Sequence, residues 1–102
     1  MKALLALIAA TGAVIASPAF ANPELAQQKN CMACHAVDKK IIGPAYKEVA
    51  AKYAGQKDAA DKLADKIVKG SKDTWGPVPM PANAQVSAAE AKQLAAWVLS
   101  TK

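Results

Sequence analysis

Apolar side chains recur along this chain at helical spacing, and the two-residue alternation of a strand is absent. Between residues 46 and 53 they fall at positions i, i+3, i+4 and i+7, which places them on one helix face. The same spacing recurs in 60–68 and 91–99. These faces predict three helices around one core of Tyr46, Val49, Ala50, Tyr53, Ala60, Leu63, Ala64, Ile67, Val68, Ala91, Leu94, Ala95, Val98 and Leu99, with Trp97 beside it.

Start and stop signals bound these helices and add a fourth. The signals are a possible Asp58 cap and a Ser87–Glu90 capping box at helix starts, and Gly55 and Gly70 at helix ends. A short helix is expected from Pro23 to about Lys29, because Asn22 can cap it and proline suits the first helical position. The predicted fold class is all-α, with about four short helices.

Two segments are predicted to be irregular. Residues 41–46 contain a Gly43-Pro44 turn, and residues 76–83 carry three prolines within six positions. Proline excludes a helix interior and favours an extended, rigid path. Val78 and Met80 lie inside this second segment, although apolar residues are unusual in a solvent-exposed loop.

The first 21 residues have the pattern of a cleaved secretory signal peptide. A positive start at Lys2 is followed by an apolar run and an Ala19-Phe20-Ala21 cleavage site. The run of about 14 residues is shorter than the roughly 20 needed to span a bilayer, so a retained anchor is the weaker alternative. We expect a single domain at 22–102, exported to a bacterial periplasm without stable membrane insertion.

The charge pattern bears on partners. The formal net charge is +5, and removal of Lys2 with the signal peptide leaves +4. The lysines alternate with acidic residues, and arginine is absent. Nucleic-acid binders usually have concentrated basic stripes, so this class is not expected. An acidic protein partner fits better, and ordinary solubility explains the charge equally well.

Residues 31–35, CMACH, hold both cysteines and the only histidine of the chain. A thioredoxin-like redox pair would need a strand before the motif, and structural zinc would need a fourth ligand. A local disulfide would leave His35 without a role. Covalent haem gives both cysteines and the histidine a role. Cys31 and Cys34 lie about one helical turn apart, roughly 5–6 Å between Cβ atoms, which suits thioether bonds to two neighbouring vinyl groups, and His35 can then reach the iron. A prosthetic group would also complete the thin, alanine-rich core of so small a domain.

A second axial ligand for haem iron would have to come from a methionine or a lysine. Met1 leaves with the signal peptide and Met32 lies inside the attachment loop, so Met80 is the candidate. An ordinary core methionine and an open iron site are the alternatives.

The chain resembles a small bacterial class I cytochrome c of the c-551 type. The resemblance covers nearly all of 22–102, through CMACHAVDKK (31–40), GPAY (43–46), GSKDTWGPVPMPAN (70–83) and AAWVLS (95–100). It implies one haem c, with thioethers from Cys31 and Cys34, His35 as proximal and Met80 as distal ligand, the Pro44 carbonyl on the His35 ring, Trp75 on a propionate, and Asn83 bonded around the Met80 sulfur. Several relatives have an arginine facing the propionates at position 66; lysine cannot make the same bidentate contact, so Lys66 is expected on a solvated helix face instead.

The implied function is one-electron transfer without catalysis, by a monomer. Lys39, Lys40 and Lys72 are expected around an apolar docking edge. Family analogy suggests a quinol-oxidising complex as donor and nitrite reductase or a terminal oxidase as acceptor. Two rival functions stay open: a peroxidase-like enzyme or gas sensor with a displaceable Met80, and a cofactor-free binding module.

Overall fold

The computed structural model describes residues 23–102; the predicted signal peptide and its cleavage site lie outside the described residues. This part of the chain contains four α-helices and one short 3₁₀ helix: α1 (Pro23–Gln28), η1 (Cys31–Ala33), α2 (Tyr46–Tyr53), α3 (Ala59–Lys69) and α4 (Ala88–Ser100). Within 23–102, extended pairing is limited to two isolated β-bridges. The all-α prediction is therefore confirmed, and η1 is the element that it lacked.

The helix ends follow the predicted signals, with one difference. At the start of α4, Glu90 N donates to Ser87 Oγ (3.1 Å) and Ser87 N donates to Glu90 Oε1 (3.0 Å), which confirms the capping box. Asp58 occupies the N-cap position of α3, but its side chain makes no capping hydrogen bond. Its carboxylate instead lies 3.7 Å from Lys62 Nζ, one turn along the helix, so Asp58 contributes an ion pair and not a cap.

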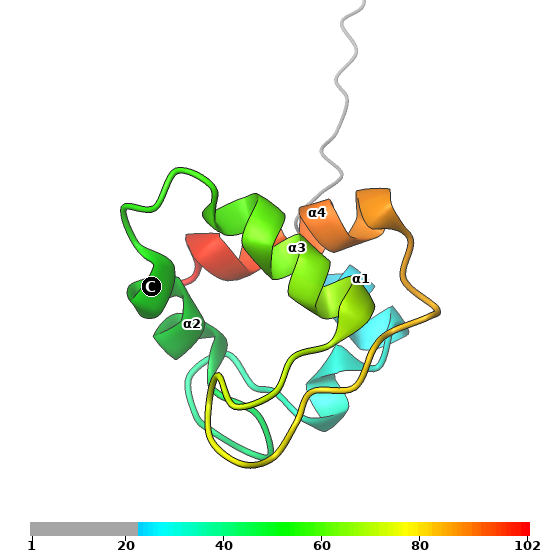
Figure 1. The fold of residues 1–102 in the computed structure, drawn as a ribbon, viewed down its shortest axis with the longest axis horizontal. Coiled ribbons are helices and arrows are strands. Elements are labelled where there is room, and N and C mark those ends of the chain that lie inside the picture. The colour runs from blue at the N-terminus through cyan, green and yellow to red at the C-terminus, as the bar shows by residue number, and fades with distance from the viewer. Residues whose placement is uncertain (1–22) are drawn as a thin grey trace, which may run out of the picture.

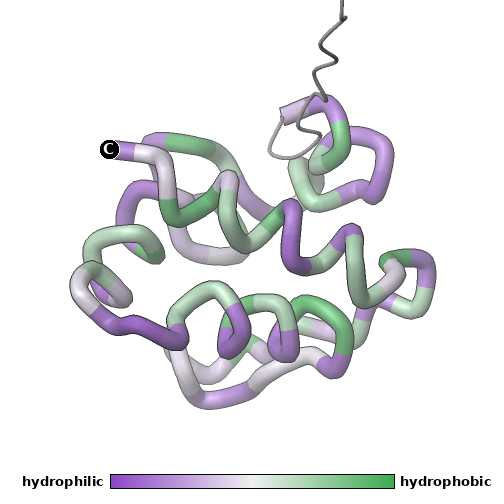
Figure 2. The backbone as a smooth tube through the Cα atoms, turned by 90° about the horizontal axis from the view of Figure 1, so that it is seen from above, coloured by the Kyte–Doolittle hydropathy of each residue, from purple (hydrophilic) through white to green (hydrophobic). Residues whose placement is uncertain are grey.

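Helix α4 is the centre of the packing. It contacts α3, α2 and α1, and α1 also contacts η1 (Figure 1). Figure 2 shows hydrophobic and hydrophilic residues alternating within the helical coils, as expected when each buries one face. Ala45 and Ala50 are buried, and the contiguous core cluster consists of Ala26, Tyr46, Val49, Tyr53, Ala59, Leu63, Ala64, Val86, Ala91, Leu94, Ala95 and Val98.

Some predicted core positions are only partly buried. Ala60, Ile67, Val68 and Leu99 pack against the core without being enclosed by it. For Ile67 the reason is that its side chain lines a cavity between α3 and the irregular segments. These segments, 29–45 and 70–87, lie on the side of α3 away from α4 in Figure 1 and carry most of the residues singled out from the sequence. Within residues 23–102, no helix has the length and apolar character needed to cross a membrane.

Candidate functional site

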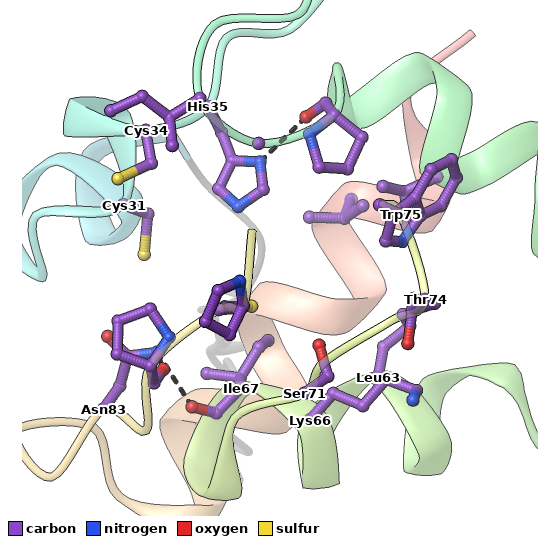
Figure 3. A pocket seen from close by; sticks show the side chains of 18 of the residues that line it. Cys31, Cys34, His35, Leu63, Lys66, Ile67, Ser71, Thr74, Trp75 and Asn83 are labelled. Atoms are coloured by element: carbon purple, nitrogen blue, oxygen red, sulfur yellow. Dashed lines mark hydrogen bonds between the residues drawn. The ribbon is translucent and has the colours of Figure 1, made fainter. Parts of the chain in front are cut away.

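A cavity of about 320 Å³ lies between η1, α3 and the two irregular segments. Figure 3 shows Cys31, Cys34 and His35 on one side of it and Leu63 and Ile67 of α3 across from them. All seven residues predicted for the site line this cavity: Cys31, Cys34, His35, Pro44, Trp75, Met80 and Asn83. The structure thus brings together residues that are far apart in the sequence.

The two cysteines are arranged by a single 3₁₀ turn. Cys34 N and His35 N both donate to Cys31 O, at 3.2 and 3.1 Å, so the turn closes between the two cysteines and leads directly into His35. Both thiols are half-buried and free, which contradicts the local-disulfide alternative. Burial raises the pKa of the Cys31 thiol, so at neutral pH this group is a protonated thiol.

His35 is oriented by the turn that follows it. Its Nδ1 lies 2.8 Å from the carbonyl oxygen of Pro44. Because that oxygen can only accept, Nδ1 carries the proton and Nε2 keeps its lone pair, the tautomer that a metal ligand requires. Figure 3 shows this second nitrogen facing the cavity. The turn itself is held by Gly43 N, which donates to Cys34 O at 2.7 Å.

Gly43 is required by its closeness to the imidazole. A Cβ at this position would lie 2.5 Å from His35 Cε1, 2.9 Å from Nδ1 and 3.1 Å from Nε2. These distances place the carbon over the ring and not beyond its edge. Any larger residue would therefore push the imidazole out of position.

Met80 is held by an antiparallel bridge at the base of its loop. Ser71 N donates to Met80 O at 3.0 Å, and Met80 N donates to Ser71 O at 2.8 Å. Beyond Met80, Asn83 N donates to the carbonyls of Ile67 and Val68, which ties the end of the loop to the last turn of α3. The C-terminal half of the proline-rich segment is thus anchored at two positions, to Ser71 through Met80 and to α3 through Asn83.

Asn83 anchors this loop through its side chain as well. Its amide nitrogen donates to Ile67 O at 2.9 Å and to Pro81 O at 3.4 Å, as Figure 3 shows for Ile67. Both amide hydrogens are therefore directed to the backbone. The contact with the Met80 sulfur expected from the resemblance stays a prediction, and the structure gives Asn83 an anchoring contact that the sequence did not indicate.

Several charged groups stand at the cavity. Trp75 lines it, and Lys52 of α2 lies over the Trp75 ring at 5.1 Å from its centroid. Lys66 is half-buried and lines the cavity too, which corrects the expectation of a solvated helix face: α3 turns this position toward the site. The cavity lining also includes Lys40 and Lys72. These lysines are suited to anionic groups on a bound molecule.

The other interpretations of the CMACH motif lose their support. Within residues 23–102, no cluster of three or more His, Cys, Asp or Glu side chains could hold a metal ion, which contradicts the zinc alternative. A thioredoxin-like pair lacks the strand that it needs, because the part of the chain described by the structure has none.

The residues present fit a covalent haem. The cavity is within the usual size range of cofactor sites, and most of its lining is apolar. Two free thiols one turn apart can form thioethers, and an imidazole nitrogen with a free lone pair faces the interior. A methionine thioether from the pinned loop lines the same space. These are the donors that haem c uses.

Fold and cavity together define a class I cytochrome c, a small helical protein that carries one covalently bound haem c. The chain belongs to the Cytochrome c family, whose sequence model matches residues 22–102.

Its relatives include cytochrome c-552 of Hydrogenobacter thermophilus, 57% identical over 94% of this chain and 95% of that protein. Cytochrome c-551 of Pseudomonas aeruginosa is also 57% identical, over 98% of this chain and 96% of its own. The crystal structure of wild-type Nitrosomonas europaea cytochrome c552 aligns with a TM-score of 0.78 at 53% identity, covering 79% of this chain and all of that one. The protein is therefore similar to small electron-carrier cytochromes c.

Proposed function

We propose that this protein shuttles single electrons in a bacterial periplasm through a haem attached by Cys31 and Cys34 and ligated by His35 and Met80. The observation that carries the proposal is the fixed imidazole: Nδ1 is committed to Pro44 O, and Nε2 faces a cavity that Met80 also lines. The bound haem supplies the one-electron couple of its iron.

Each residue has a distinct task in this mechanism. His35 presents a neutral nitrogen whose basicity is strengthened by the hydrogen bond to Pro44. Met80 presents a soft thioether, which favours the reduced state and raises the reduction potential. The Ser71 bridge and the Asn83 contacts hold Met80 at a fixed depth, so little has to rearrange when the charge changes.

Two protein ligands also argue for a carrier and against an enzyme. If His35 and Met80 both ligated the iron, oxygen, peroxide or another substrate would have no coordination position at which to bind. The rival function, a peroxidase-like enzyme or gas sensor, requires Met80 to leave readily. The pinning of its loop at Ser71 and at Asn83 supports the carrier.

The docking edge combines apolar and basic side chains. Ile41, Ile42 and Val78 are 47%, 55% and 60% exposed, and Ile42 and Val78 line the cavity itself. The exposed Lys39, Lys40 and Lys72 belong to the same two irregular segments. Electron-transfer contacts are small, below about 1,200 Å², and charge steers the encounter. An acidic redox protein suits this edge.

Donor and acceptor are inferred from the family. A quinol-oxidising membrane complex would reduce the carrier, and a nitrite reductase or terminal oxidase would oxidise it. The expected signal peptide at 1–21 supports a periplasmic location, and the carrier is expected to act as a monomer.

Optical spectra of both redox states test the ligands. The ferric protein should show the weak far-red charge-transfer band of sulfur on iron, and the ferrous protein should not bind carbon monoxide at neutral pH. Met80→Ala should abolish the band and admit carbon monoxide. Met32→Leu is the matched control, because Met32 lies in η1 and should leave both properties intact. A band that survives in Met80→Ala would refute the assignment.

A further inference from the structure

Tyr46 stacks on the imidazole of His35. The two ring centroids are 5.0 Å apart and the ring planes differ by 23°. Tyr46 is the first residue of α2 and is only 5% exposed. A contact of this kind between a buried aromatic ring and the imidazole is a candidate for control of the imidazole plane.

Tyr46 itself is held from two directions. Its backbone N–H donates to the carbonyl of Ala36, the residue after His35, at 2.9 Å. The next N–H of α2, that of Lys47, donates to Val37 O at 3.0 Å. The first turn of α2 is therefore bonded to the segment that carries His35, so the two rings keep their relative position.

The second contact that positions Tyr46 comes from α4. The ring of Trp97 meets the Tyr46 ring edge-on, with centroids 5.0 Å apart and an interplanar angle of 69°. Edge-to-face geometry is favourable for two aromatic rings. Tyr46 thus lies between Trp97 and His35, and the central helix of the fold supports the imidazole through it.

The hydrogen bond to Pro44 does not fix the imidazole plane alone. It restrains the position of Nδ1, but hydrogen-bond geometry tolerates some misalignment, so the ring can still tilt about the Cβ–Cγ bond while the hydrogen bond persists. The torsion that sets the plane of a histidine ring is intrinsically broad, so packing has to define it. Gly43 packs close to Cε1 of the imidazole and limits its movement there. The stacked Tyr46 ring is a flat surface that defines the orientation of the imidazole plane.

We propose that Tyr46 is a positioning residue for His35, whose stacked ring sets the plane of the imidazole; this rests on the proposed ligation of iron by His35. The plane of an axial imidazole decides which iron d orbitals it meets. It therefore controls the anisotropy of the ferric g tensor and the spread of the haem methyl resonances. The ring, and not the hydroxyl group, carries this effect.

The test compares variants of the haem-loaded protein. Tyr46→Phe keeps the ring and should retain the g values and methyl shifts of the parent. Tyr46→Leu and Tyr46→Met remove the ring and should shift both, together with the reduction potential. Tyr53→Leu is the matched control, since Tyr53 is another buried tyrosine of α2, 7% exposed. It should lower the melting temperature without moving these signals.

Each outcome decides the matter. Unchanged g values in the ring-free variants, or equal shifts in Tyr46→Phe, would overturn the role of the ring. If neither ring-free variant folds, Trp97→Leu decides, because it removes the outer support of Tyr46; an unchanged g tensor there counts against the proposal. A parent protein without the far-red sulfur band would instead refute the proposed ligand pair, independently of Tyr46.

Discussion

Ser71 and Met80 exchange two backbone hydrogen bonds, with N···O distances of 3.0 and 2.8 Å, across the base of the proline-rich loop. This bridge determines how far the Met80 side chain can reach. Next to it lies Gly70, whose φ is +85°, and a Cβ there would lie 2.6 Å from Met80 O. The loop therefore depends on glycine at this position for two separate reasons.

We predict that Gly70→Ala weakens the proposed bond between the Met80 sulfur and the haem iron. Gly55 has nearly the same φ, +83°, but a Cβ there meets nothing within 4 Å, so Gly55→Ala is a matched control. Both variants place a Cβ at positive φ, which costs about 1–3 kcal/mol, and at Gly70 the accompanying ψ of 175° is a conformation that essentially only glycine adopts. Only Gly70→Ala adds a steric clash of about 1–3 kcal/mol, which corresponds to a further loss of at least about 4 °C in Tm. The far-red band should weaken in Gly70→Ala alone, and equal behaviour of the two would contradict this account.

At Trp75 the contribution of ring packing to stability can be measured separately from the contribution of the indole N–H to the reduction potential. In Trp75→Phe the aromatic face under Lys52 persists, so the free energy of unfolding should fall by no more than about 1 kcal/mol. If the N–H donates to a haem propionate, the reduction potential should still shift, because a hydrogen bond to a charged group is lost. Lys52→Gln tests the packing separately and should leave the potential in place. An unchanged potential in Trp75→Phe would reduce Trp75 to a packing role.

Glu90 is expected to make stability depend on acid pH. Its capping bond from Ser87 N and its pairing with Lys29 Nζ (3.3 Å) hold the pKa of Glu90 below its ordinary value. A depressed folded-state pKa stabilises the fold above the unfolded-state pKa, about 4.3, and this contribution disappears as the pH falls through the folded value. Glu90→Gln should therefore be less stable than the parent near pH 7, with a smaller difference near pH 2–3.

Thermal unfolding across this pH range measures the effect. Asp65→Asn is the control, because Asp65 pairs with Lys69 on an exposed helix face and such pairs contribute little. A Glu90→Gln deficit that is constant from neutral to acid pH would show that the charge is irrelevant.

The docking lysines are predicted to govern the salt dependence of electron transfer. Replacing Lys39, Lys40 and Lys72 by glutamine should lower the rate with an acidic partner by roughly tenfold at low ionic strength and flatten its salt dependence. The control is the same triple change at Lys47, Lys57 and Lys102, which are exposed and absent from the cavity lining. Stopped-flow rates at several salt concentrations measure both. A comparable loss in the control would mean that net charge, and not the docking edge, steers the encounter.

Much of the fold could be predicted because a helix with one buried face requires apolar residues at regular spacing in the sequence. The apolar face of α4 at Ala91, Leu94, Ala95 and Val98 is buried as expected, and the Ser87 capping box marks its start. The three-residue helix η1 has no such spacing, since it is shorter than one period. It became visible only through the backbone bonds to Cys31 O.

The sequence could predict which residues line the cavity, but it could not predict the contacts that hold them in position. The cysteines and the histidine of CMACH and Met80 stand out by their chemistry, and these four residues line one cavity. The stack of Tyr46 on His35 and the inward turn of Lys66 depend on how helices pack, which local spacing does not encode. Tyr46 was predicted as a core residue, and its position in GPAY, two residues after Pro44, was the signal that could have linked it to His35.

Helix α4 contacts each of the other α-helices in 23–102, yet it is the last of them to be synthesised. The CMACH motif leaves the ribosome long before α4, the helix against which the other helices pack. A nascent chain therefore exposes CMACH while its fold is still incomplete, and the packing of 23–102 is completed only when α4 has been synthesised. Premature termination before Ala88 would leave both thiols available for haem attachment in a chain that lacks the central helix of its fold.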